Sequence, residues 1–132
     1  MKINTDALLG DALIWAVTKA LGKAPVIAGT GVAYKSDHGS WVYPRYASDD
    51  EAVALMTQEW IGVDRPSRGQ TTPLWRAVTD SKLKRGTGHF EPVVSAFGGT
   101  IGLAVCRALV ASRLGAEVDV PAELHPAHAA AA

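Results

Sequence analysis

The sequence predicts an α+β fold in which two main helices and one short helix pack on a small, mostly antiparallel sheet. Apolar residues recur at helical spacing over residues 6–21 and 101–114, which predicts the two main helices. Short apolar runs punctuated by glycine and proline lie between them and predict the strands. We expect residues 1–124 to form a single domain and residues 125–132 to be a frayed, alanine-rich tail.

The first helix is predicted over residues 6–21. Thr5 stands where an N-cap would accept a hydrogen bond, and Gly22 stands where a left-handed residue would end the helix. Trp15 lies on a helical face, so we expect it in the core. The apolar stripe of this helix comprises Leu9, Leu13, Ala16, Val17 and Ala20.

Two strands are predicted next, over residues 25–36 and 40–46. The residues between them, 37–39, are Asp, His and Gly, which favour a hairpin-like turn. Pro44 has no backbone N–H to donate to a neighbouring strand. The second strand therefore ends at this proline or lies at the edge of the sheet.

A short helix is predicted from Ser48 to about Trp60. Ser48 and Glu51 have the spacing of a capping box, in which the serine hydroxyl accepts from the Glu51 amide and the Glu51 carboxylate reaches back. Val53, Met56 and Trp60 then share one helical face, which we expect to be buried.

The second half of the chain is predicted to alternate loops with short elements. Gly115 stands where a glycine would end the second main helix. The predicted segments are a strand end and loop at 61–70, a short strand at 74–80, a flexible loop at 81–92, the helix at 101–114 and a short strand at 117–120.

Composition restricts the function. Thirteen basic residues balance thirteen acidic ones, which disfavours binding to duplex DNA or to an anionic membrane. The single cysteine, Cys106, excludes an internal disulfide and a multi-thiolate zinc site, and its place on an apolar helical face predicts a core thiol. No apolar run is long enough for a membrane span, and the N-terminus lacks the pattern of a signal peptide. We therefore expect a cytosolic protein.

The two ends of the chain carry motifs that are specific in combination. Residues 1–17 read MKIxTxxLxGxxLxWAV, and residues 103–124 read LAVCRALVASRLGxEVxVPxEL. Together they resemble the NinX-like proteins of lambdoid phages and prophages. Residues 43–44 (Tyr-Pro) and 60–63 (Trp-Ile-Gly-Val) resemble a weaker pattern in the middle of that family.

The chain departs from the family pattern over residues 64–99. Family members usually carry a Gly-Pro-Thr-Pro type of entry to the last helix, where this chain reads Phe-Gly-Gly-Thr-Ile at 97–101. The resemblance implies a phage or prophage origin and a cytosolic role during infection. It implies no activity, because the function of the family is unknown.

Positive charge is concentrated in residues 64–90, which hold six basic residues against two acidic ones. A local positive patch on a neutral protein attracts small anions rather than long polyanions, and the planar fork of arginine suits phosphate. The alternative interpretation is a solvated basic loop. The charged residues are Arg65, Arg68, Arg76, Lys82, Lys84 and Arg85 against Asp64 and Asp80.

Aromatic residues and a helix start could complete an anion site. Trp41, Tyr43 and Trp75 lie on short predicted strands beside loops, where nucleotide bases could stack on them. Gly99 and Thr100 open the helix at 101–114, whose free amides would attract an anion, although glycine before a helix is also common without any ligand. The predicted ligand-binding residues, which the fold or a subunit interface must bring together, are Trp41, Tyr43, Arg65, Arg68, Trp75, Arg76, Gly99 and Thr100.

Signals for catalysis and for metal binding are weaker. His89 could act as a base, but no motif places a nucleophile with it. His125 and His128 have the spacing of metal ligands, but the surrounding alanine tail offers no further ligand. We therefore predict no catalytic residue, no metal site and no cofactor.

The leading functional hypothesis is a phage-encoded, non-catalytic protein that sequesters a small anionic nucleotide-type signal molecule as an anti-defence sponge, a step that rests on analogy. One alternative is an accessory protein that binds a host protein through exposed aromatic residues. Another is a small nucleotide-processing enzyme that uses His89. We also expect a homo-oligomer, because an edge strand and exposed aromatic residues leave adhesive surface.

Overall fold

The computed structural model describes residues 1–29, 31–65, 74–79 and 94–124, and the predicted α+β class is confirmed there. The described helices are α1 (Gly10–Ala20), α2 (Asp49–Glu59) and α3 (Ile101–Leu114), with two 3-10 turns, η1 (Thr5–Ala7) and η2 (Ala122–Leu124). The described strands are β1 (Lys2–Asn4), β2 (Val26–Ala28), β3 (Gly31–Lys35), β4 (Trp41–Val42), β5 (Ile61–Asp64), β6 (Trp75–Thr79), β7 (Ser95–Gly98) and β8 (Glu117–Asp119).

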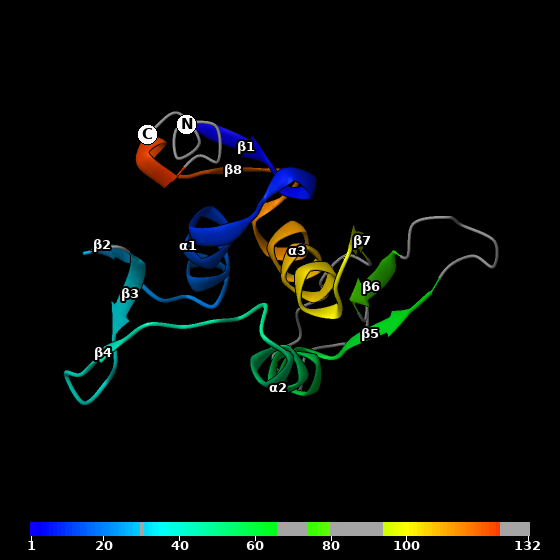
Figure 1. The fold of residues 1–132 in the computed structure, drawn as a ribbon, viewed down its shortest axis with the longest axis horizontal. Helices are drawn as coiled ribbons and strands as arrows, with labels where there is room; N and C mark the ends of the chain where they lie inside the picture. The colour runs from blue at the N-terminus through cyan, green and yellow to red at the C-terminus, as the bar shows by residue number, and fades with distance from the viewer. Residues whose placement is uncertain (30, 66–73, 80–93, 125–132) are drawn as a thin grey trace, which may run out of the picture.

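The described strands form three antiparallel sheets rather than one. Their orders are β1-β8, β2-β3-β4 and β5-β6-β7. The sheets lie on different sides of the helices, with β2-β3-β4 and β5-β6-β7 at opposite ends of the longest axis (Figure 1). In β1-β8, Lys2 lies opposite Asp119, so this sheet joins the two ends of the described chain.

Helix α3 is the centre of the core. It packs against α1 and α2 and against strands β6 and β7. Its buried side chains include Val105, Leu109 and Cys106, so the predicted core thiol is confirmed. Trp15 of α1 is partly buried against the same core.

Glycine allows two close approaches to α3. A Cβ atom at Gly102 would overlap the carbonyl oxygen of Ala47, which precedes α2, and would lie 2.6 Å from its carbonyl carbon. A Cβ atom at Gly98 would lie 2.7 Å from the backbone nitrogen of Ala104. Both neighbours are backbone atoms, so the fold requires the absence of a side chain at these two positions.

The first helix begins at Gly10 and not at residue 6 as predicted. Thr5 is not its N-cap, because the Thr5 hydroxyl donates to the Gly115 carbonyl at 2.7 Å and the Thr5 amide donates to the Ala116 carbonyl at 2.8 Å. These bonds tie Thr5 to the chain that follows α3. Leu9, predicted to face inward, is exposed. Gly22 has the predicted left-handed backbone, with φ +79°.

The strand predicted over 25–36 is a hairpin of β2 and β3. Gly29 has a φ of +63°, which turns the chain where the prediction continued the strand. The strand predicted over 40–46 is limited to β4, and Pro44 lies beyond its end. The turn predicted at 37–39 is confirmed, with the Gly39 amide donating to the Ser36 carbonyl at 2.9 Å.

The predicted capping box at the start of α2 is wrong in its bonding. Ser48 is the N-cap, but its hydroxyl donates to the Arg45 carbonyl at 2.7 Å instead of accepting from Glu51. The Glu51 carboxylate does reach back, but it accepts from the Arg45 amide at 2.7 Å. Both the backbone N–H and the carbonyl of Arg45 are therefore bonded, which fixes the turn before α2.

The buried face of α2 is also different from the prediction. Ala52 and Leu55 are buried, whereas Val53 is exposed. Trp60, predicted in the core, is 51% exposed because α2 ends at Glu59 and Trp60 takes a left-handed backbone with φ 57°. A pattern that extends the helix by one residue places this tryptophan on the wrong face.

The sheet that follows α2 was predicted only in part. Residues 61–64 form strand β5, and β6 lies within the strand predicted at 74–80. The prediction missed β7, which runs into Gly98. The helix predicted at 101–114 is confirmed as α3 at both ends, and Thr100 is its N-cap.

The buried Tyr46 hydroxyl and Cys106 thiol lead us to expect a loss of stability at alkaline pH. Burial raises the pKa of Tyr46 from 10.0 to about 12 and the pKa of the Cys106 thiol from 9.0 to about 12. The folded state therefore keeps protons that the unfolded state releases. This contribution is complete below pH 9 and is lost as the pH rises toward 12, by up to about 1.4 kcal/mol per pH unit for each group.

Urea unfolding at a series of pH values checks this expectation. The wild type should lose stability steadily above pH 9, the usual pKa of a thiol. Tyr46→Phe should show a shallower decline above pH 10, whereas Tyr43→Phe, at an exposed position, is the matched control. Equal declines in Tyr46→Phe and the wild type would contradict the role assigned to Tyr46.

Candidate functional site

One end of the sheet β5-β6-β7 gathers several of the predicted ligand-binding residues. The strand register places Asp64 opposite Arg76, and Trp75 opposite Gly98. Arg65 follows directly after Asp64, and Gly99 follows directly after Gly98. Because neighbouring strands are antiparallel, the end of β5, the start of β6 and the end of β7 meet at this end of the sheet (Figure 1).

Arg76 is already paired within this site. Its Nε and Nη2 donate to the two carboxylate oxygens of Asp64 at 2.9 and 2.6 Å, which is the bidentate geometry of a strong ion pair. The hydrogen bonds from Arg76 lower the pKa of Asp64, and the same bonds raise the pKa of Arg76. The charge of Arg76 is therefore neutralised, and its fork is occupied.

Arg65 forms no such ion pair with the residues that the structure describes. Its guanidinium carbon lies 4.9 Å from the centre of the Trp75 ring, in a cation–π contact. No described carboxylate forms an ion pair with Arg65, whose side chain is exposed. Its charge is therefore available to a ligand, and Trp75 limits the directions in which the guanidinium can point.

The start of α3 lies close to this pair in the strand register, because Gly98, opposite Trp75, comes just before it. The Thr100 hydroxyl accepts from the Leu103 amide at 3.2 Å, so it caps the helix. No acidic residue lies in the first turn of α3. The positive end of the helix dipole is left without a charged side chain there, and the Thr100 hydroxyl, which accepts in the cap, can still donate to an anion.

Trp41 and Tyr43 do not lie with Arg65 and Trp75 within one chain, which leaves the subunit interface that the prediction also allowed. They are 55% and 58% exposed and belong to β4 and the residue just beyond it. Their sheet and the sheet with Trp75 lie at opposite ends of the molecule, with the helices between them (Figure 1). Trp41 and Trp75 are far apart because their strands, β4 and β6, belong to different sheets.

Other predicted residues lie outside the described part of the chain. These include Arg68, His89, His125 and His128. The Thr79 amide donates to the Val94 carbonyl at 3.0 Å, and the Val94 amide donates to the Thr79 hydroxyl at 3.0 Å. These two bonds join the end of β6 to the residue before β7.

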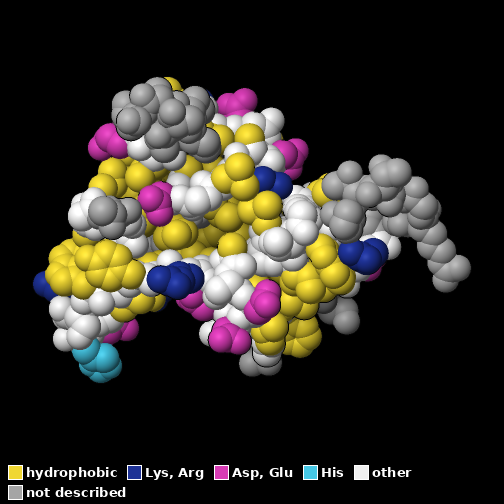
Figure 2. Space-filling view, viewed as in Figure 1, with side chains coloured by type: hydrophobic (Ala, Val, Ile, Leu, Met, Phe, Trp, Pro, Cys, Tyr) yellow, Lys and Arg dark blue, Asp and Glu magenta, His cyan; other side chains and the backbone are white. Residues whose placement is uncertain are grey.

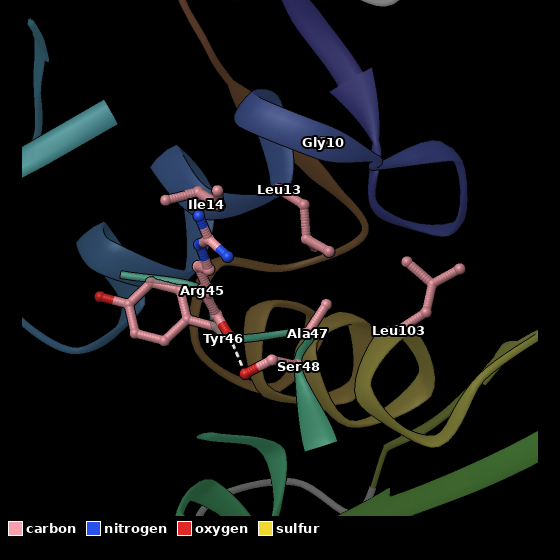
Figure 3. Close-up of a pocket in the computed structure, with 8 residues that line it drawn as sticks. All are labelled: Gly10, Leu13, Ile14, Arg45, Tyr46, Ala47, Ser48 and Leu103. Carbon is pink, nitrogen blue, oxygen red and sulfur yellow. Dashed lines mark hydrogen bonds between the residues drawn. The ribbon is translucent and has the colours of Figure 1, made fainter. Parts of the chain in front are cut away.

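An apolar groove with a volume of about 290 Å³ lies between α1 and α3 and was not predicted from the sequence. Three segments far apart in the sequence form it, and no local pattern marks it. Figure 3 shows the side chains of Leu13 and Leu103 on opposite sides of this space, with Arg45 close to it. The groove is lined by Gly10, Leu13, Ile14, Arg45, Tyr46, Ala47, Ser48 and Leu103.

No protein-family model matches the chain, and no curated protein is significantly similar to it. The resemblance to NinX-like proteins therefore stays a prediction. Among residues 1–29, 31–65, 74–79 and 94–124, no three His, Cys, Asp or Glu side chains gather as a metal site would require. No helix in the same part of the chain is long and apolar enough to cross a membrane.

Proposed function

We propose that the protein is a non-catalytic binding protein for a small nucleotide-type anion, with Arg65 and Trp75 as the centre of its site. The resemblance to a phage family suggests that it sequesters a nucleotide signal inside an infected cell. The observation that carries the proposal is the Arg65–Trp75 pair, which holds an exposed cation against an aromatic ring.

Three other described arginines already bond to the protein through their guanidinium groups. Arg107 donates to the carbonyls of Leu8 and Phe97, at 3.2 and 2.9 Å. Arg113 and Arg76 form ion pairs with glutamate and aspartate. The guanidinium groups of these three arginines are therefore occupied, whereas Arg65 makes no hydrogen bond or ion pair with any described residue and contacts the Trp75 ring.

A stacked guanidinium can recognise both parts of a nucleotide. Its outer plane can stack on a base, and its edge can donate two parallel hydrogen bonds to a phosphate. The nearby start of α3 adds a favourable dipole for the phosphate. A base and a phosphate together therefore match this site better than either does alone.

Calorimetry with cyclic dinucleotides, cyclic mononucleotides and ADP-ribose tests the proposal. Arg65→Ala should weaken binding by about 1.5–3 kcal/mol, as expected for a hydrogen bond to a charged group. Trp75→Ala should weaken it by about 1–3 kcal/mol through the loss of stacking. The matched control is the double variant Asp64→Asn with Arg76→Gln, which removes a charge pair beside the site without changing the net charge.

Two outcomes would overturn the proposal. The wild type would bind no member of the panel, or Arg65→Ala would bind as tightly as the control variant. Chromatographic evidence that a bound nucleotide is converted would instead favour the enzyme alternative that uses His89, and His89→Ala should then abolish the conversion.

The second candidate function is an interaction protein, and the sheet β2-β3-β4 favours it. Four large apolar side chains are exposed on or beside this sheet, and its outer strands β2 and β4 have no described strand partner on their outer sides. Hydrophobic side chains gather over this end of the molecule (Figure 2), and exposed apolar side chains beside unpaired strand edges are typical of an interface. The exposed residues are Val26, Ile27, Trp41 and Tyr43.

We also propose that the chain forms a homo-oligomer through this sheet. Light scattering should give a mass of at least a dimer for the wild type. The double variant Trp41→Ser with Tyr43→Ser should have a lower mass, because it loses the two most exposed aromatic side chains of this surface. A monomer mass for the wild type at every concentration would refute self-association.

A further inference from the structure

We propose that the groove between α1 and α3 binds a second class of ligand, a small amphipathic carboxylate with an unbranched apolar chain. The apolar chain would fill the groove, and Arg45 would pair with the carboxylate. The proposal does not depend on the Arg65–Trp75 site, because no residue is shared between the two.

The groove has the form of a small-molecule site. Its volume of about 290 Å³ lies at the lower end for pockets that enclose small ligands. Leu13, Ile14 and Leu103 form much of its lining, and the Leu13 and Leu103 side chains lie on opposite sides of it (Figure 3). An unbranched hydrocarbon chain matches such a lining because it needs no hydrogen-bond partner inside the groove.

Arg45 is the charged residue of the groove. Its guanidinium has no ion pair or hydrogen bond with any described residue, and Figure 3 shows it beside Ile14. Its backbone is nevertheless fixed, because the amide donates to Glu51 and the carbonyl accepts from Ser48, each at 2.7 Å. The backbone is thus held while the cation stays available.

The polar groups around the groove favour a single negative charge on the ligand. The Tyr46 hydroxyl lies 3.1 Å from the Thr18 hydroxyl, so these two groups satisfy each other. Acidic residues occupy the first turn of α2 directly after Ser48, and they would repel a phosphate with two charges. A monocarboxylate pairs with one arginine and meets the least repulsion.

The start of α1 adds a favourable feature at the same groove. Gly10, the first residue of α1, borders the groove, and its N-cap Leu9 makes no side-chain cap. The first backbone amides of α1 are therefore not capped by a side chain of the N-cap residue. Gly10 and Arg45 line the same groove, so a carboxylate bound there would also lie near the positive end of α1.

Titration followed by NMR, with hexanoate, octanoate and decanoate as probes, tests the proposal. Affinity should rise by about fourfold for each added methylene until the groove is full. The neutral probe 1-octanol should bind about fivefold more weakly than octanoate, and Arg45→Gln should weaken octanoate binding by the same factor. The shifted resonances should be those of Leu13, Ile14 and Leu103.

Three variants make the result specific. Leu103→Trp, at a partly buried position of the lining, should fill the groove and abolish octanoate binding, and circular dichroism should confirm that this variant is folded. Lys2→Gln removes a positive charge from exposed β1 and should leave octanoate binding unchanged. Arg65→Ala should also leave it unchanged, so failure here and failure of the proposed nucleotide site are distinguishable.

Several results would overturn the proposal. Equal affinities for octanoate and 1-octanol would show that Arg45 recognises no carboxylate. Octanoate binding that survives both Arg45→Gln and Leu103→Trp would place the ligand elsewhere. Failure of all three carboxylates to bind, together with a lower oligomer mass for Leu103→Trp, would show that a second copy of the chain occupies the groove.

Discussion

Replacing Gly102 by alanine is expected to destabilise the protein by about 3 kcal/mol, at the upper end for an overpacked core. The added Cβ would overlap the Ala47 carbonyl oxygen, and this atom belongs to the backbone. The backbone before α2 is also held by the bonds of Arg45 with Ser48 and Glu51, so it cannot move aside freely. Urea unfolding followed by circular dichroism measures the loss.

Gly62→Ala is the matched control for this substitution. Gly62 lies in β5, and nothing lies within 4 Å of a Cβ atom added there. The change should be within about 1 kcal/mol of the wild type, because it mainly restricts the unfolded chain. A similar stability for Gly102→Ala and Gly62→Ala would mean that α3 and Ala47 are not in close contact.

Loss of the ion pair between Arg113 and Glu59 is the second large effect that we expect. Arg113 Nη2 donates to Glu59 Oε2 at 2.5 Å, and the two side chains are only 16% and 13% exposed. Arg113 Nη1 also donates to the carbonyl of Ala20 at 3.0 Å. One residue of α3 thus joins the last residues of α1 and α2.

Glu59→Ala should therefore cost about 3 kcal/mol, because it leaves the arginine largely buried without its carboxylate. A double-mutant cycle with Arg113→Ala, measured by urea unfolding, should show coupling between the two positions. Arg76→Ala, which breaks an exposed pair with Asp64, is the control and should change stability little. Additive effects of Glu59→Ala and Arg113→Ala would contradict a direct pairing.

Local signals in the sequence account for the best predictions. Helix α3 was predicted at both ends because Thr100 and Gly115 are adjacent to its apolar pattern and act on the helix directly. The same kind of signal failed at Trp60. Its place is decided by the residue at which α2 ends, and hydrophobic spacing does not determine that residue.

Long-range pairing accounts for what was missed. Strand β1 is only three residues long and pairs with β8 at the other end of the described chain, so nothing near it in sequence marks it as a strand. Arg65 and Trp75 were correctly grouped because they lie at one end of adjacent strands. Trp41 belongs to another sheet of the same chain, and its residue type carries no information about which sheet it joins.

The groove between α1 and α3 could not be predicted for the same reason, because it depends on segments far apart in the sequence. Its lining comes from α1, the turn before α2 and α3, which are separated by many residues in the chain. Each of these segments was interpreted as a helix or a turn with its own local role. Only the packing of α1 against α3 makes a hollow between them, and packing is not encoded by any one segment.

The β1-β8 sheet also has a consequence for synthesis of the protein. The amino group of Met1 donates to the Val120 carbonyl at 3.0 Å, and Thr5 bonds to Gly115 and Ala116. Because a chain is made from its N-terminal side, these early residues wait for residues 115–120 before they have these partners. Because α3, the centre of the core, is also made late, we expect folding to be completed only after translation has passed residue 120.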